Sequence, residues 1–365
     1  MQREAELAAA LCRAPLRDNA RSLITDSLDW PLFFAMIPVW GVEPLVLFNL
    51  NNSFAAELPA DVRRRSATIE KNARGAALAN TLVLLEVADR FRNSAIEALV
   101  LKGPAVGVAA YGDPSLRAFS DIDLLVKPHD ISAARDLLVS LGYHRDFESG
   151  AEASLLRAEH ALEFSGQRMK VELHTVLVSR HLRFRIDDEW LWRSAREIDC
   201  AGRRLRTIGA SEHFLFLCAH GAKHEWERLG WVNDVAHLGW KLSPDERREV
   251  VALARAAHGE RILALAVRLA RDVYGDTGTP FDDLLCEPES VTAPLVSAAK
   301  RRLGLEAQAA RAGGWLERVH PNLRPLLYWS RARERRVDQV GSLAHLFLQR
   351  VGRSFTSSRV HGEAH

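Results

Sequence analysis

The spacing of hydrophobic positions changes along the chain, and each change predicts a different kind of element. From Asp61 to Asn93, apolar residues recur near helical spacing without a proline, which predicts one long helix. Short apolar runs of strand length follow at 97–101, 121–126, 142–147, 160–165 and 170–176. Helices are predicted between them at 104–110 and 129–141, and then at 187–196 before a hairpin at 197–208. Helical spacing returns at 211–227, 231–242, 244–257 and 259–273.

These patterns predict four regions. Residues 1–95 form an N-terminal helical region, and 96–210 form an α/β core in which strands alternate with helices. Residues 211–274 form a second helical region that completes a cleft, and 275–365 form a helical, basic C-terminal region. The stretch 275–294 carries Gly, Pro, Asp and Thr, so it is the predicted loop or linker.

Two aspartates one residue apart open the apolar run at 121–126. Because strand side chains alternate between faces, Asp121 and Asp123 point the same way. Two buried carboxylates repel each other and raise each other's pKa. A protein keeps such a pair when a hard cation bridges them, and Mg²⁺ is usually shared with substrate phosphates. The alternative is a solvated strand entrance with two unpaired acids.

A glycine turn precedes this pair. Residues 97–104 predict a strand, a turn at Gly103 and a helix that begins at Pro104. Such a turn presents backbone N–H groups at a helix N-terminus, which suits an anion. Lys102 adds a point charge suited to phosphate.

The run at 170–176 alternates with period two, which places Lys170, Glu172 and His174 on one face. The simplest use of this polar face is to bring Glu172 beside Asp121 and Asp123 as a third carboxylate. The alternative for Glu172 is an exposed acid on an edge strand. For His174, orientation of Glu172 or contact with phosphate stands against a half-buried strand histidine.

Together these residues resemble the palm of the DNA-polymerase-beta-like nucleotidyltransferase superfamily, and more narrowly the bacterial "uncharacterised nucleotidyltransferase" family. The resemblance covers about residues 70 to 240. The motifs that carry it are Leu101-Lys102-Gly103-Pro104, Tyr111-Gly112-Asp113-Pro114, Arg117, Asp121-Ile122-Asp123-Leu124-Leu125-Val126, Val171-Glu172-Leu173-His174, and His220-Gly221-Ala222-Lys223-His224 with Trp231 and Asp234. The wider superfamily usually has Gly-Ser or Gly-Gly where this chain has Gly103-Pro104.

The resemblance implies an α+β fold, in which a small mixed-sheet palm is flanked by N-terminal and C-terminal helical regions. It implies that Asp121 and Asp123 hold Mg²⁺ or Mn²⁺. Glu172 would complete the second metal site or act as a base toward an acceptor hydroxyl. Three residues would meet the triphosphate of an NTP: Lys102, Gly103 and Arg117. For Arg117, neutralisation of Asp121 is an equal alternative.

Two histidines, His220 and His224, lie four residues apart on one face of the predicted helix 211–227. The spacing matches zinc-protease histidines, but Gly221 stands where those enzymes carry the general-base glutamate, so that interpretation fails. We expect His224 and Asp234 to line the acceptor side of the cleft, with their two helices packed beside the strand that bears Glu172. The alternative is a structural network that faces away from the cleft.

Composition is that of a globular protein: 365 residues, 47% hydrophobic and 26% charged. The four cysteines are scattered without a Cys-x-x-Cys pair, so neither a disulfide framework nor a zinc knuckle is indicated. The first residues carry acids and no long apolar run, so we expect no signal peptide. No run approaches the ~20 apolar residues of a transmembrane helix. The expected location is cytoplasmic.

Charge is uneven along the chain. Residues 295–365 hold thirteen Lys or Arg against five Asp or Glu, a net charge of +8, which leaves −6 on the rest. The clustered arginines are Arg331, Arg333, Arg335 and Arg336. This basic cluster is a candidate surface for an anionic partner. The alternative is a solvated helix face, because Glu334 and Asp338 interrupt the run.

We therefore expect metal-dependent transfer of a nucleotidyl or phosphoryl group from an NTP to a hydroxyl-bearing small molecule, sugar or peptide. The alternative is a catalytically inactive nucleotide-sensing or protein-interaction module on the same fold. Retention of all three carboxylates favours the enzyme. The net charge of −6 on residues 1–294 argues against a nucleic-acid acceptor, because binding to a phosphate backbone requires a basic cleft.

Overall fold

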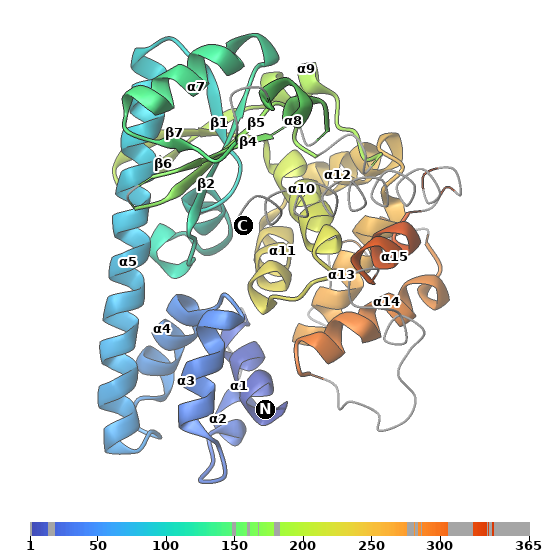
Figure 1. The fold of residues 1–365 in the computed structure, drawn as a ribbon. Helices are drawn as coiled ribbons and strands as arrows, with labels where there is room; N and C mark the ends of the chain where they lie inside the picture. The colour runs from blue at the N-terminus through green and yellow to red at the C-terminus, as the bar shows by residue number, and fades with distance from the viewer. Residues whose placement is uncertain are drawn as a thin grey trace, which may run out of the picture.

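A computed structural model shows the fold (Figure 1). It describes residues 2–13, 19–147, 151–158, 161–166, 168–178, 183–275, 287–305 and 324–333, together with positions 281, 284, 285, 335 and 338. No described helix combines the length and the apolar composition needed to span a lipid bilayer.

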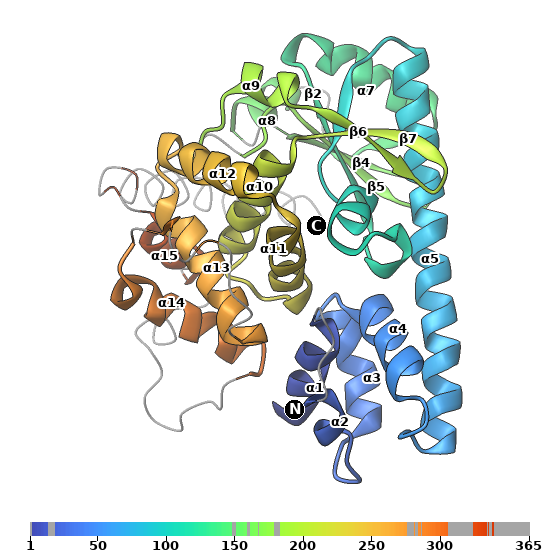
Figure 2. The ribbon, with the colours of Figure 1, turned by 180° about the vertical axis from the view of Figure 1, so that it is seen from behind.

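The N-terminal region is helical, as predicted. Its helices are α1 (Gln2–Cys12), α2 (Asn19–Leu23), α3 (Trp30–Val39), α4 (Glu43–Phe54) and α5 (Ala60–Asn93). The α3 helix begins after Asp29, whose carboxylate accepts a hydrogen bond from the backbone N–H of Leu32 at 2.9 Å. Helix α5 runs along one side of the molecule, from the N-terminal helices to the sheet (Figures 1 and 2).

The core is a seven-stranded mixed sheet. Its strands are β1 (Ala98–Val100), β2 (Asp121–Val126), β3 (His144–Arg145), β4 (Ala161–Ser165), β5 (Lys170–His174), β6 (Arg196–Cys200) and β7 (Arg203–Thr207). They lie in the order β3-β4-β5-β2-β1-β7-β6. The pairs β2–β5 and β1–β7 are parallel, and the other neighbours are antiparallel. The α+β fold with helical flanks is therefore confirmed.

Alternation along the central strands divides the sheet into two faces. Ile122 and Leu124 of β2, with Val171 of β5, pack in one buried cluster together with side chains of α5 and of α7 (Ile131–Ser140). Leu125 belongs to a second cluster on the other face, with Leu99 and neighbours from later in the chain. The polar residues of β2 and β5 share this second face, so they point away from α5 and α7.

Short elements connect the strands. They are α6 (Pro104–Val106), the π-helical turn η1 (Gly107–Tyr111), the 3₁₀ turns η2 (Pro114–Leu116) and η3 (Pro128–Asp130), α8 (Glu152–Ala158) and α9 (Asp188–Arg193). The predicted strand 142–147 is wrong in length, because only His144 and Arg145 pair with β4. Both side chains are exposed, and Gly142 has a φ of +86° that ends α7 rather than beginning a strand.

The chain after the sheet is helical again. Its helices are α10 (Ala210–Lys223), α11 (Leu229–Lys241), α12 (Pro244–Ala256), α13 (Glu260–Tyr274), α14 (Glu289–Arg302) and α15 (Arg324–Arg331). The predicted linker 275–294 is wrong at its end, since α14 begins at Glu289. Helix α10 ends four residues earlier than predicted, because Glu225 and Trp226 have φ angles of +56° and +55°.

One buried core joins the two helical regions. Side chains from α1, α3 and α4 belong to the same hydrophobic cluster as those of α10, α11 and α13. The two regions approach each other closely at Gly230, the second residue of α11: its N–H donates to the carbonyl oxygen of Trp40 at 2.9 Å, and a Cβ there would lie 2.6 Å from the carbonyl oxygen of Gly41. Only glycine allows this approach, so residue 230 fixes the N-terminal region against α11.

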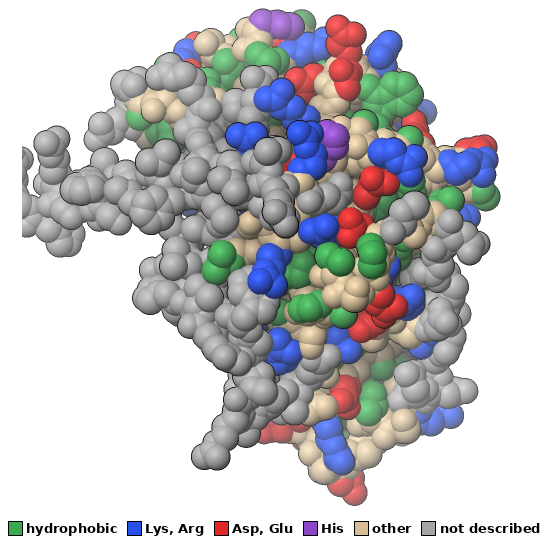
Figure 3. Space-filling view, turned by 90° about the vertical axis from the view of Figure 1, so that its right-hand side faces the viewer, with side chains coloured by type: hydrophobic (Ala, Val, Ile, Leu, Met, Phe, Trp, Pro, Cys, Tyr) green, Lys and Arg blue, Asp and Glu red, His purple; other side chains and the backbone are tan. Residues whose placement is uncertain are grey.

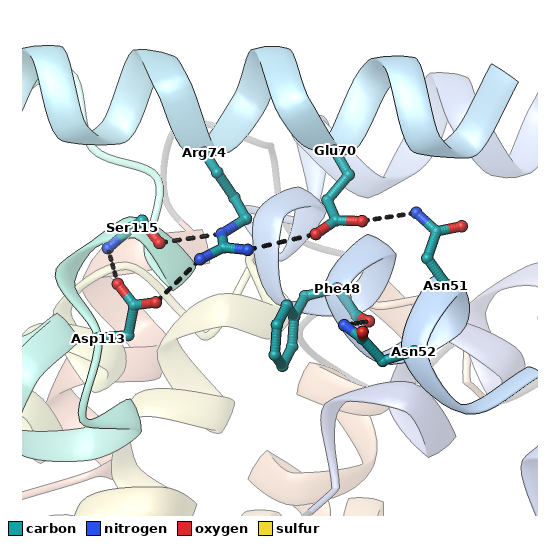
Figure 4. Close-up of polar contacts among 7 residues, drawn as sticks. All are labelled: Phe48, Asn51, Asn52, Glu70, Arg74, Asp113 and Ser115. Atoms are coloured by element: carbon teal, nitrogen blue, oxygen red, sulfur yellow. Dashed lines mark hydrogen bonds and ion pairs between the residues drawn. The ribbon is translucent and has the colours of Figure 1, made fainter. Parts of the chain in front are cut away.

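A polar network attaches α5 to the loop before β2 (Figure 4). The guanidinium of Arg74 donates to Ser115 Oγ at 3.0 Å and pairs with Asp113 Oδ2 at 3.0 Å. It also lies over the ring of Phe48, 5.0 Å from its centroid. Glu70, one turn earlier on α5, accepts a hydrogen bond from Asn51 of α4 at 2.7 Å. These contacts set the position of the loop that leads into Arg117 and the acidic strand.

Candidate functional site

A cavity of about 600 Å³ lies between the sheet and helices α10 and α11. This volume is within the range of small-molecule sites. The sheet side and its loops contribute Lys102, Arg117, Phe119, Asp121, Asp123, Glu163, Glu172 and His174. The helical side contributes Phe216, His220, Lys223, His224, Arg228, Trp231 and Asp234. Gly41 brings the N-terminal region to the same cavity.

The strand register brings three carboxylates together. In the parallel pair β2–β5, Asp123 lies opposite Glu172, and Asp121 lies opposite Lys170. Asp121 is two residues from Asp123, so it shares the same face. Asp123 is buried with 2% of its surface exposed, whereas Asp121 and Glu172 are half-buried. All three line the cavity.

Lys102 is the charge partner of Asp123. The backbone N–H of Leu101 donates to the carbonyl oxygen of Asp123 at 3.1 Å, which holds the end of β1 beside β2. The next side chain then places Lys102 Nζ 2.7 Å from Asp123 Oδ1. On the other side, His174 Nε2 lies 3.4 Å from the same oxygen and 3.3 Å from Glu172 Oε2. Two potential cations thus flank the most buried carboxylate.

The local charges separate the pKa values of the two aspartates. Burial raises the pKa of Asp121, and the neighbouring Asp123 raises it further. Burial also acts upward on the pKa of Asp123, but Lys102 and His174 outweigh it and hold that pKa below its usual range. The imidazole of His174, 3.3 Å from Glu172 Oε2, lowers the pKa of Glu172. Asp123 and Glu172 are therefore the carboxylates most strongly held in the charged form.

The side chains around Asp123 offer a set of ligand atoms that fits a cation. Among the described residues, the group of three potential metal ligands whose donor atoms all lie within 4.8 Å of one another is Asp123, Glu172 and His174. Both oxygens of Asp123 and Nε2 of His174 are buried, without a hydrogen bond of regular geometry in the described part of the chain. The sequence predicts Asp121 as the third ligand, whereas the structure groups His174 with Asp123 and Glu172. Asp121 also lines the cavity.

Gly103 is not among the residues that line the cavity, and its predicted contact with a phosphate stays a prediction. Its φ is +61°, and a Cβ at this position would lie 3.0 Å from the ring of Phe119. Asn80 of α5 holds Phe119 in place by donating to its carbonyl oxygen at 2.8 Å. The glycine therefore lets the chain turn sharply beneath an aromatic ring, and the ring faces the cavity in its place.

Arg117 lines the cavity and is paired with Asp234, while its predicted contact with the triphosphate stays a prediction. Its Nε lies 3.0 Å and its Nη2 2.9 Å from Asp234 Oδ2. The hydroxyl of Tyr111 donates to Asp234 Oδ1 at 2.6 Å, and it accepts from Asn233 at 2.9 Å. This buried network ties the loop before β2 to α11. Asp234 thereby reaches the cavity wall as a partner of Arg117.

Aromatic and imidazole rings form the opposite wall. The centroids of His220 and His224 are 4.8 Å apart, and each lies 5.2 Å from the ring of Trp231. Burial lowers the pKa of His224 to about 3, with Lys223 as the next cause, and lowers the pKa of His220 well below its usual value. Both rings are therefore neutral at pH 7. Arg228 lies over Trp231, 5.6 Å from its centroid.

A glycine sets the position of this wall. A Cβ on Gly221 would lie 2.3 Å from the indole of Trp226, which is fully buried against it. The end of α10 therefore packs on Trp226 at Gly221. His220, directly before this glycine, and His224, three residues after it, line the cavity. The His-Gly-x-x-His spacing serves this packing rather than a metal-protease site.

The arginines of the C-terminal basic cluster have different environments. Arg333 is buried and donates to the carbonyl oxygens of Arg183 and Ala257, at 2.8 and 3.2 Å. Arg335 lies 3.8 Å from Asp338, and Arg336 lies outside the described residues. On the face that carries α14 and α15, described basic and acidic side chains are interspersed (Figure 3). None of the described members of the cluster lines the cavity.

Sequence reasoning missed several residues of this site. Glu163 of β4 lies opposite Glu172 in the antiparallel pair β4–β5 and adds a further carboxylate to the sheet side of the cavity. Its signal was present, because it alternates with buried Leu162 and Phe164. Tyr111 and Asn233 carried no such signal, since their partner Asp234 is more than a hundred residues from Tyr111.

Comparison with known proteins is consistent with this geometry. No curated protein matches the chain. The family described as "Uncharacterised nucleotidyltransferase" matches residues 26–275, which include every cavity-lining residue named above. The match covers more than half of the chain and contains both walls of the cavity. The chain therefore belongs to the Uncharacterised nucleotidyltransferase family.

Proposed function

We propose that the protein transfers a nucleotidyl group from an NTP to the hydroxyl of a small molecule, sugar or peptide. The observation that carries this proposal is the row of carboxylates Asp121, Asp123 and Glu172 on one wall of a cavity of about 600 Å³. Membership of a nucleotidyltransferase family supports the reaction class. The acceptor's hydroxyl oxygen would bond to the α-phosphorus as the bond to the bridging oxygen breaks and pyrophosphate leaves, and the hydroxyl proton would pass to solvent.

The carboxylates fit a divalent cation, since the buried oxygens of Asp123 lack hydrogen bonds of regular geometry among the described residues. Asp121, Asp123 and Glu172 would hold Mg²⁺ or Mn²⁺. A bound cation supplies neutralisation of the triphosphate charge and a template for in-line attack.

Side chains around the carboxylates would position the substrates. Lys102 is the cation nearest to the carboxylates, and it would meet a phosphate oxygen when a metal takes over Asp123. Glu172 has a lowered pKa, which suits a ligand better than a base. The ring wall of His220, His224 and Trp231 offers flat surfaces to a planar group or a sugar face.

Transfer of radioactive label tests the proposal. The protein would be incubated with Mg²⁺ or Mn²⁺, an extract of the source organism, and each NTP labelled at the α- or the γ-phosphate. Transfer of α-label to an acceptor, lost in Asp123→Asn and kept in the surface variant Glu197→Gln, is the expected result. Transfer of γ-label alone would make the protein a kinase. Nucleotide binding without either transfer would favour the nucleotide-sensing alternative.

A further inference from the structure

His174, the last residue of β5, lies beside Asp123 and Glu172, and the proposed nucleotidyl transfer gives it no role. We call these three residues the acidic corner. The Nε2 of His174 is the atom that faces both carboxylates, 3.4 Å from Asp123 Oδ1 and 3.3 Å from Glu172 Oε2. It is buried, without a hydrogen bond of regular geometry among the described residues. The i, i+2 spacing on β5 places it on the same face as Glu172, so the strand itself directs this ring into the corner.

The separations match those of ligands around one ion. Donor atoms about 2.1 Å from a common metal lie about 3.0 to 3.4 Å from each other, for the right angles of an octahedron or the wider angles of a tetrahedron. The nitrogen of His174 has such separations from one oxygen of each carboxylate. All three donors also lie within 4.8 Å of one another. Binding of an ion by these donors would require Lys102 Nζ, which lies 2.7 Å from the same Asp123 oxygen, to move away.

The chemistry of the donors determines which ion fits. Carboxylates and water suit Mg²⁺, Ca²⁺ and Mn²⁺, whereas imidazole suits the first-row transition ions, of which Mn²⁺ is the one that also takes carboxylates and water. A site with two carboxylates and one imidazole therefore favours a first-row transition ion over Mg²⁺, which rarely takes a nitrogen ligand from protein.

From this arrangement we infer that His174 is a direct nitrogen ligand of the cation held by Asp123 and Glu172, and that the site selects a first-row transition ion over Mg²⁺. The inference rests on the proposed function only for the presence of a cation among these carboxylates. It assigns His174 a bond to the metal rather than the orientation of Glu172. The competing assignment is a protonated His174 that only neutralises its two acidic neighbours.

Pulsed electron paramagnetic resonance of Mn²⁺ added to the full-length protein tests the inference, because it detects nitrogen nuclei bonded to the ion. We expect a nitrogen coupling in the parent protein that is absent from His174→Gln. His224→Gln is the matched control: it removes another imidazole of the same cavity, so the coupling should persist. Loss of the coupling in His224→Gln with retention in His174→Gln would overturn the assignment.

Binding isotherms give a second readout. The parent should bind Mn²⁺ more tightly than Mg²⁺, and His174→Gln should lose at least roughly 10- to 100-fold in Mn²⁺ affinity, the scale of loss on mutating residues that only hydrogen-bond to a metal ligand. Mg²⁺ affinity should change less. Equal loss for both ions, or no Mn²⁺ binding by the folded parent, would also overturn the inference.

The two proposals fail in different ways. Bound Mn²⁺ without nitrogen coupling removes the role of His174 and leaves nucleotidyl transfer standing, since that reaction needs only the carboxylates. Nitrogen coupling in a protein that transfers no label removes the proposed reaction and leaves the ligand assignment intact.

Discussion

Lys102 Nζ lies 2.7 Å from Asp123 Oδ1, so the most buried carboxylate of the cavity is held by a side chain from the neighbouring strand end. Removing one partner of a buried pair leaves an uncompensated charge and typically costs about 3–5 kcal/mol. We predict that Lys102→Met lowers the free energy of unfolding by about 3 kcal/mol without divalent cations. Mn²⁺ should restore more stability to this variant than to the parent, because the ion supplies the missing positive charge. Urea unfolding with and without Mn²⁺ measures both effects, and the exposed Lys170→Met is the control.

Asp121 has a raised pKa, which means that its charged form is disfavoured in the folded state. Above the ordinary carboxyl pKa, this charge therefore costs stability in the metal-free protein. We predict that Asp121→Asn leaves the metal-free melting temperature unchanged or slightly higher, and abolishes the further gain from Mg²⁺ or Mn²⁺ with an NTP. Thermal melts compare it with Glu197→Gln, which should keep that gain. A metal-dependent gain of parental size in Asp121→Asn would contradict the predicted metal site.

Gly103 has a positive φ and also lies beneath the Phe119 ring. Gly103→Ala should lose roughly 1–3 kcal/mol from backbone strain, plus the cost of moving the ring. Gly142→Ala isolates the first component, because residue 142 has a φ of +86° and no atom within 4 Å of an added Cβ. We expect the larger loss at 103, with part of it recovered by Phe119→Leu in the same chain. Equal losses at the two glycines in urea unfolding would show that the ring contributes nothing.

The pair Arg117–Asp234 crosses from the loop before β2 to α11 and is largely shielded from solvent. Arg117→Met and Asp234→Asn should each destabilise the protein by about 3–5 kcal/mol. Each variant leaves the other member of the pair as a buried charge without its partner. The double variant should lose much less than the sum, since both charges are then absent. A double-mutant cycle by urea unfolding measures the coupling. Additive losses would mean that the two residues act independently.

Buried His213 and half-buried His224 predict an acid-sensitive fold. The pKa of His213 is lowered to about 3 by burial and by Arg196, and that of His224 to about 3 by burial and by Lys223. Between pH 6.5 and 3 the unfolded chain binds these protons while the folded chain does not, so the free energy of unfolding falls as pH falls. Each group contributes up to about 1.4 kcal/mol per pH unit. His224→Gln should flatten this dependence in unfolding titrations, whereas the exposed His144→Gln should leave it unchanged.

Local sequence patterns predicted those elements in which the apolar positions are the buried ones. The run Asp121–Val126 is β2 to the residue, because its apolar positions are buried on both faces. The helix predicted from Asp61 to Asn93 is α5 with one residue added. The predicted strand at 142–147 failed because its two paired residues bury nothing, so hydrophobicity could not report its length.

The candidate site was predictable where strands carry it and not where distant contacts do. Asp123 and Glu172 needed only the two-residue period and a shared sheet. The position of Phe119 over Gly103 and the pairing of Arg117 with Asp234 depend on tertiary packing between residues far apart in the chain. No spacing rule reports such contacts, because they arise when loops are fixed by α5 and α11.

The parallel register of β2 and β5 has a consequence for how this protein tolerates change. A shift of β5 by one residue would carry Glu172 and His174 to the opposite face of the sheet and turn Val171 and Leu173 toward the cavity. Every side chain would still be present in the chain, yet the acidic corner would be dismantled. An insertion or deletion that shifts β5 therefore removes several cavity residues at once, whereas a substitution within the site removes one. The apolar residues Val171 and Leu173 guard against such slippage, because they have buried places only in the register that the structure shows.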